Sequence, residues 1–127
     1  MIGKVIAHLL KANADLLVIV PAGNIYPYVM NEDTHLPAII YTIDSVTPGY
    51  DKDGWLCDEC IFSVVTFCDN YTTLQSIALE IRQALELQSG THEGITLRNI
   101  YLTGQLEGFN IQEDVFLNKQ TFSTEII

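Results

Sequence analysis

The chain has 127 residues, 48% of them hydrophobic, so it is long enough to bury the core of one domain spanning residues 1–127 and too apolar for a disordered protein. Its net charge of −10, from 16 acidic and 6 basic residues, argues against sequence-specific nucleic-acid binding, because such binding uses Lys and Arg to neutralise phosphates. The longest apolar runs fall short of the roughly 18 residues that span a membrane and of a signal-peptide core, so we expect a cytoplasmic protein without membrane partners.

The first part of the chain predicts a helix followed by a short extended segment. Ile2 to Ala12 carries apolar residues on one helical face, with Lys4, His8 and Lys11 opposite. The turn residues Pro21-Ala22-Gly23-Asn24 follow. Ile25 to Met30 is then predicted to be extended, and Pro27 within it favours an edge position in a sheet, because proline cannot donate a backbone hydrogen bond.

The middle of the chain predicts two long strands. Ala38 to Val46 and Trp55 to Cys68 are rich in β-branched and aromatic residues. The acidic, turn-rich segment from Thr47 to Gly54 lies between them. We therefore predict a hairpin with an extended tip.

The second half predicts a helix and a closing strand pair. Asp69 or Asn70 is suited to cap the helix, and Gly90 is expected just past its end. Strands are predicted from Ile95 to Leu106 and from Val115 to Ile126. The apolar stripe of the helix consists of Leu74, Ile77, Ala78, Ile81, Ala84 and Leu85.

These elements predict an α+β fold. We expect a two-layer sandwich in which two main helices cover one face of a mostly antiparallel sheet of four to five strands. Val64 and Val65 are consecutive apolar residues in a central strand, which favours a sheet that is covered on both faces. Another subunit is one candidate cover for the second face.

The segment Cys57-Asp58-Glu59-Cys60 has the spacing of zinc knuckles and thiol redox sites. On a continuous strand, however, Cys57 and Cys60 would point to opposite faces. A structural zinc site also needs four ligands, and only Cys68 and dispersed histidines remain. Ordinary reduced cysteines are the favoured interpretation, and a small thiol- or zinc-dependent protein centred on Cys57 and Cys60 is the alternative from a different functional class.

No other segment predicts catalysis or cofactor binding. Asp51-Lys52-Asp53-Gly54 lacks the remaining ligands and flanking helices of a calcium loop. His8, His35 and His92 have no nucleophile or carboxylate at useful local spacing. We therefore expect no enzyme, no cofactor and no metal.

Several large apolar residues are predicted to be exposed. Leu79 and Leu87 are expected opposite the apolar stripe of the second helix, and the others lie near loops or edges. Together with a sheet that is apolar on both faces, they favour a homo-oligomer. The candidate subunit or partner interface consists of Tyr26, Tyr28, Trp55, Leu79 and Leu87.

The order of motifs resembles that of the tail-terminator (tail-completion) proteins of long-tailed phages and prophages, the family of minor tail protein U. The motifs are Ile25-Tyr26-Pro27 after a glycine turn, Leu36-Pro37 before a β-rich run, a long hairpin, Tyr71 opening the second helix, and a final strand pair. The resemblance covers nearly the whole chain and depends on the order and spacing of these motifs.

The resemblance implies a structural virion protein. Such proteins form a hexameric ring that caps the tail tube and joins it to the head connector, so the implied partners are further copies, the tail-tube protein and the connector. The implied location is the bacterial cytoplasm during assembly and then the virion tail. Another head-tail joining protein is the alternative.

The resemblance also implies that the hairpin tip, Thr47 to Glu59, is mobile in a free subunit. Its carboxylates would face either the lumen of the ring or a neighbouring subunit. These carboxylates are Asp51, Asp53, Asp58 and Glu59.

Overall fold

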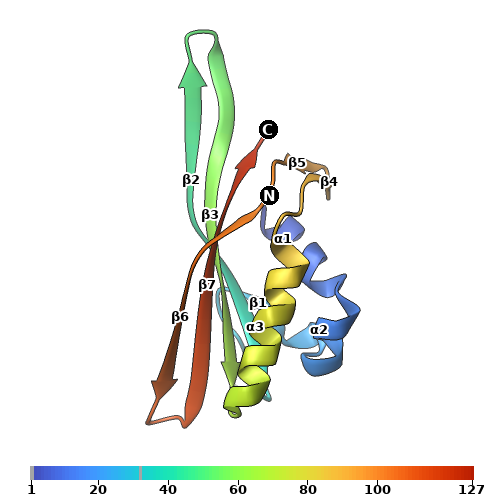
Figure 1. Ribbon diagram of the computed structural model, residues 1–127, viewed down its shortest axis with the longest axis vertical. Coiled ribbons are helices and arrows are strands. Elements are labelled where there is room, and N and C mark those ends of the chain that lie inside the picture. Colours follow the sequence, from blue (N-terminus) through green and yellow to red (C-terminus); the bar gives the residue numbers. More distant parts are fainter. Residues whose placement is uncertain (1, 32) are drawn as a thin grey trace.

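The computed structural model describes residues 2–31 and 33–127, and it has an α+β fold (Figure 1). The α-helices of this described part are α1 (Ile2–Lys11), α2 (Ala14–Ile19) and α3 (Tyr71–Leu85), and a short 3-10 helix, η1 (Ala22–Asn24), precedes the first strand. The strands are β1 (Ile25–Pro27), β2 (Ala38–Asp51), β3 (Gly54–Cys68), β4 (Gly90–His92), β5 (Ile95–Leu97), β6 (Tyr101–Asn110) and β7 (Val115–Ile126).

The strands form one sheet with long antiparallel strands at its centre. The order is β1-β2-β3-β7-β5-β4, and β6 also pairs with β7. β1 pairs in parallel with β2 through Ile25↔Ile39 and lies at the edge, as Pro27 predicted. The mostly antiparallel α+β fold is as expected, but the sheet has 7 strands where four or five were predicted.

Part of the difference in strand number arises where one strand, Ile95 to Leu106, was predicted. The structure interrupts it after Leu97 and resumes it at Tyr101. Between them Ile100 is buried, its N–H donates to the Gln88 carbonyl, and its own carbonyl accepts from the N–H of Leu87. The chain thus leaves the sheet to bond with the segment after α3, a contact that strand propensity does not encode.

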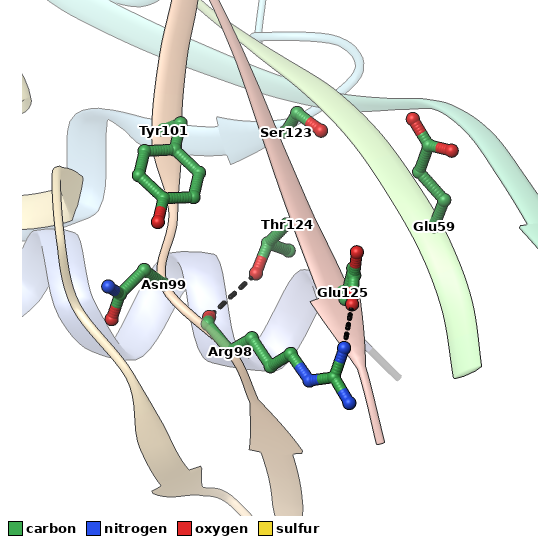
Figure 2. A pocket seen from close by; sticks show the side chains of 7 residues that line it. All are labelled: Glu59, Arg98, Asn99, Tyr101, Ser123, Thr124 and Glu125. Carbon is green, nitrogen blue, oxygen red and sulfur yellow. Dashed lines mark hydrogen bonds and ion pairs between the residues drawn. The ribbon is translucent and has the colours of Figure 1, made fainter. Parts of the chain in front are cut away.

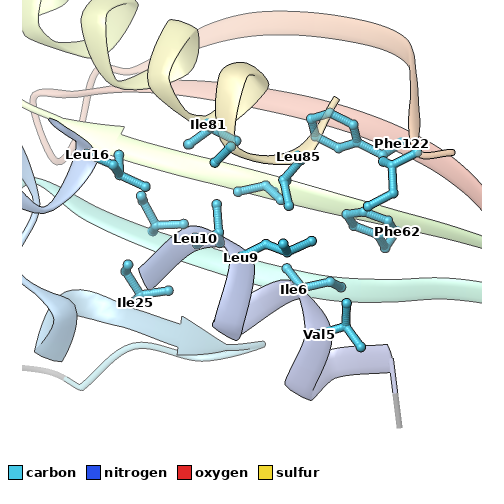
Figure 3. Close-up of a cluster of buried hydrophobic side chains, with 14 of the residues drawn as sticks. Val5, Ile6, Leu9, Leu10, Leu16, Ile25, Phe62, Ile81, Leu85 and Phe122 are labelled. Atoms are coloured by element: carbon cyan, nitrogen blue, oxygen red, sulfur yellow. The ribbon is translucent and has the colours of Figure 1, made fainter. Parts of the chain in front are cut away.

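The helices pack on one face of the sheet and enclose the core (Figure 3). In this layer α1 contacts β2 and α3, while α3 contacts β3 and β7. Phe62 of β3 and Phe122 of β7 are fully buried there, with ring centroids 5.4 Å apart. Burial of such side chains is the main stabilising term of a small domain. The other core residues labelled in Figure 3 are Val5, Ile6, Leu9, Leu10, Leu16, Ile25, Ile81 and Leu85.

The second main helix begins as predicted and ends earlier. Asn70 caps α3, since its side-chain oxygen accepts from the N–H of Thr73 at 3.0 Å. The helix ends at Leu85, and Gly90 belongs to β4. Leu87 has φ = 64° and lies beyond the helix, so the prediction that it extends the outer face of α3 was wrong.

The sheet face away from the helices carries no helix of the described chain, but the segment before β2 reaches it, since Met30, Thr34 and Leu36 line a pocket of about 330 Å³ together with Phe67 and Leu117. Register and alternation place Ile40, Val65 and Phe67 on this face, together with Leu117 and Lys119. Their side chains are partly buried. That a second subunit covers this face stays a prediction.

Candidate interaction surfaces

The hairpin of β2 and β3 projects beyond the rest of the sheet (Figure 1). β7 ends where Ile126 pairs with Asp58, and only β2 and β3 continue past that point. We call this two-stranded projection, residues 48–57, the arm. The prediction of a long connection from Thr47 to Gly54 was wrong, because strand pairing continues to Asp51↔Gly54 and leaves only two turn residues.

The local sequence explains why the arm can be a strand pair despite its turn residues. β1 pairs with β2 only as far as Tyr41, so Pro48 occupies a free edge, where a missing N–H costs no ladder bond. Gly49 faces Cys57 so closely that a Cβ would lie 3.4 Å from the Cys57 carbonyl oxygen. The register shifts between Gly49 and Tyr50, which leaves Leu56 as an extra residue in β3.

The arm exposes large apolar side chains. Tyr50 pairs with Trp55 across the two strands. Their exposed fractions are 70% for Tyr50 and 52% for Trp55, and Leu56 beside them is 51% exposed. These side chains are thus poorly protected from solvent, and they lie on a two-stranded ribbon of a kind that is only marginally stable in water. Sequence analysis identified Trp55 and missed Tyr50 and Leu56.

The four predicted tip carboxylates separate into two groups. Asp51 and Asp53 are at the turn, where Asp51 Oδ1 accepts from the N–H of Asp53 at 2.8 Å. Asp58 accepts from Trp55 Nε1 at 2.8 Å. Asp58 and Glu59 pair with β7 at the base of the arm, so the prediction that they belong to the hairpin tip was wrong. The reason is that β2 and β3 stay paired as far as Asp51 and Gly54, which places the turn several residues away from them.

An open polar pocket of about 590 Å³ lies beside the base of the arm (Figure 2). Glu59 and Glu125 are directly opposite on adjacent strands, and such like-charged pairs repel. Arg98 neutralises one of them through an ion pair with Glu125. Thr124 Oγ1 donates to the Arg98 carbonyl at 2.9 Å and holds this segment against β7.

The two cysteines of the C-x-x-C segment occupy different environments. Cys60 is fully buried in the core, and burial raises its thiol pKa to about 11. Cys57 is nearly buried, its Sγ contacts Glu125, and burial together with that carboxylate raises the pKa of its thiol. Within residues 2–31 and 33–127 no three His, Cys, Asp or Glu side chains gather as metal ligands would. Since thiolates are the reactive and metal-binding form, this geometry does not support the thiol or zinc alternative.

The other candidate interface residues are distributed over separate elements. Tyr26 is half-buried in β1, and its hydroxyl accepts from Thr34 Oγ1 at 3.1 Å. The Tyr28 hydroxyl accepts from the N–H of Ile43 at 3.2 Å just beyond β1. Leu79 on α3 and Leu87 after it are each more than half exposed. The arm, the β1 edge and α3 thus each carry some of the predicted residues, and whether these surfaces bind other chains stays a prediction.

The outer face of α1 forms a basic surface that sequence analysis recorded only as the polar side of a helix. Lys4, His8 and Lys11 line an open pocket of about 440 Å³ together with Ala7, Ala12 and Glu93. His8 Nδ1 lies 3.3 Å from Glu93 Oε1. Neither lysine forms an ion pair with another described residue, whereas Arg82 and Arg98 pair with Glu86 and Glu125. We call this surface, with Lys4, Ala7, His8 and Lys11, the α1 face.

No helix in the described chain is long and apolar enough to cross a membrane. No model of a known protein family matches the sequence, and no curated protein matches it. Among solved structures, the chain is similar to one from a structure titled "Virion of native gene transfer agent (GTA) particle". The TM-score is 0.82 with 16% identity, and the match covers 95% of this chain and 90% of that chain. At this identity the likeness shows the fold, which the two chains share over almost their full lengths.

Proposed function

We propose that this protein is a structural component of a phage or phage-like virion, and specifically a tail terminator. The observation that carries the proposal is the fold shared with a chain of a gene transfer agent virion over 95% of this protein. The order of sequence motifs supports the same class independently. The proposal assigns the chain no catalytic step and no cofactor.

In the proposed role several copies, six by resemblance to the family, form a ring that caps the tail tube and meets the head connector. The surfaces available for these contacts are the arm, the α1 face and the helix-free face of the sheet. The net charge of −10 suits a ring through which DNA passes, because a lumen that is not basic does not bind phosphates.

The proposed role is tested by deleting the gene from the genome that encodes it and imaging the particles. A terminator stops polymerisation of the tube, so its loss gives tubes of excessive and variable length. The alternative, a head-tail joining protein, predicts tails of normal length that are detached from heads. Complementation with the intact gene must restore normal particles, and intact particles in its absence would contradict both roles.

Self-association is tested separately with the purified full chain. Sedimentation velocity over a range of concentrations is expected to show a closed oligomer of fixed mass. A continuous series of growing species would instead indicate an open filament.

A further inference from the structure

The arm exposes apolar surface that no residue in ranges 2–31 and 33–127 covers. Tyr50, Trp55 and Leu56 gather on a ribbon that has no third strand beside it. In Figure 1 the arm points away from the helical layer. An exposed group of large apolar side chains on a marginally stable ribbon is typical of a contact site.

Side chains of the arm are better suited to this contact than its backbone. Pro48 removes a donor from the free edge of β2, and the extra residue Leu56 interrupts the opposite edge in β3. Proline and bulges both disfavour the addition of a further strand. The arm is therefore suited to lie on a surface and less suited to extend another sheet.

Charge restricts the surface that the arm fits. Asp51 precedes the turn and Asp53 lies in it, while Asp58 and Glu59 lie at the base of the arm. Lys52 is the one basic residue of the segment. An acidic surface would repel it, and a basic surface would attract it, so charge favours a basic partner surface. Among the described residues of this acidic chain, Lys4 and Lys11 are the two cations without an ion pair that share one face of an element.

The two surfaces also match in size and chemistry. The four arm residues of β2 span about 13 Å, and Lys4 to Lys11 span about 10 Å along α1. Ala7 lies between the lysines, and the small side chain leaves room for a ring in the pocket of about 440 Å³. An aromatic ring of the arm placed on Ala7 would meet the flanking ammonium groups, which are attracted to aromatic faces.

We propose that the arm of one copy docks on the α1 face of a second copy of this chain. Trp55 and Tyr50 lie against Ala7, and Asp51 and Asp53 pair with the lysines of α1. The inference rests on the proposed function, because it names the contact through which the copies associate. The arm and the α1 face are different surfaces of one chain, so the contact is head-to-tail and can close into a ring.

The proposal is tested with two charge-reversed variants of the full chain. K4E/K11E makes the α1 face acidic, and D51K/D53K makes the arm basic. Each variant alone places like charges in the contact, and we expect its association to weaken roughly tenfold or more in sedimentation velocity. In an equimolar mixture the two variants can alternate around the assembly. Each acidic arm then meets a basic α1 face, and each basic arm meets an acidic one, so the mixture is expected to recover wild-type association. Glu113→Lys, in the turn between β6 and β7 and outside the three surfaces proposed for assembly, is the control for a charge reversed elsewhere.

Two further measurements report on the same contact. Trp55 is the single tryptophan, so its emission should shift to shorter wavelength as the wild type associates. At the same protein concentration K4E/K11E should show a smaller shift. Carbodiimide treatment of a mixture of ¹⁴N and ¹⁵N copies should join Asp51 or Asp53 of one isotope to Lys4 or Lys11 of the other. These cross-links would support the contact even if the complex is so weak that the average mass in sedimentation velocity stays close to that of a monomer.

The outcomes separate this inference from the proposed function. If the wild type associates and both charge-reversed variants, each folded by circular dichroism, associate equally well, the docking contact is wrong and ring assembly still stands. Failure of the mixture to recover association also overturns the contact. A wild type that stays monomeric and gives no mixed-isotope cross-links between the arm and α1 counts against both.

Discussion

At the scale of single residues, the three thiols differ in their accessibility. Cys60 and Cys68 are buried in the core, while Cys57 lies at the base of the arm beside Glu125. A disulfide reagent at pH 8 is therefore expected to leave Cys60 and Cys68 unmodified in the native protein and to modify Cys57 slowly. All three should react in denaturant. Rapid native modification of both Cys57 and Cys60 would favour the thiol-dependent alternative over a structural protein.

Burial of Cys60 also predicts a loss of stability at high pH. Its folded-state pKa is about 11, above the ordinary value of 9.0. The folded state thus favours the neutral thiol, and this contribution to stability is full below about pH 9 and lost as the pH rises through 11. Between pH 9 and 11 the melting temperature of the wild type should fall more steeply than that of Cys60→Val. Equal slopes in thermal unfolding would contradict this cause, since other titrating groups are common to both proteins.

At the scale of elements, much of the fold follows from local sequence pattern. The strand predicted from Val115 to Ile126 is β7 residue for residue, and the apolar spacing of Ile2 to Ala12 gave α1 to within one residue. The break after Leu97 could not be predicted this way, because Ile100 bonds to Leu87 and Gln88, which precede it by more than ten residues in the sequence. Pro48 and Gly49 are residue types that favour a loop, but in the structure they pair with Asp58 and Cys57 of β3 and belong to a strand.

The interaction surfaces were predicted only in part, for the same reason. Trp55 and the acidic residues could be identified because aromatic and charged side chains near a turn are visible in sequence. Tyr50 and Leu56 were missed because the turn-rich composition hid the strand that aligns them. Lys4 and Lys11 were recognised as one helical face, but their lack of ion-pair partners emerges only when the other cations have been placed.

The arm is expected to be dispensable for folding and necessary for association. We predict that replacing residues 48–58 by Asn-Gly, a turn suited to close Thr47 onto Glu59, changes the free energy of unfolding by about 1 kcal/mol or less. The reason is that the arm lies outside the main core cluster, to which Cys57 and Leu56 do not belong. Urea unfolding would measure the stability and sedimentation velocity the association. A shortened protein that does not fold would show that the arm stabilises the domain itself.

At the scale of the whole molecule, two electrostatic effects of opposite sign act on association. Each copy carries a net charge of −10, so copies repel one another at long range. The proposed contact between the acidic arm and Lys4 and Lys11 attracts at short range. Salt weakens both, but it first screens the long-range repulsion, because the Debye length falls from about 30 Å at 0.01 M to about 10 Å at 0.1 M.

Association should therefore pass through a maximum as salt is raised. It should strengthen up to roughly 0.1 M, where repulsion between whole subunits is screened, and weaken toward 1 M, where a Debye length of about 3 Å screens the paired charges as well. Sedimentation velocity at a fixed protein concentration across this range would measure the curve. In K4E/K11E the attractive part is removed, so its weaker association should rise with salt throughout. A wild-type curve that also rises throughout would mean that apolar burial alone holds the copies together, with no contribution from the lysines of α1.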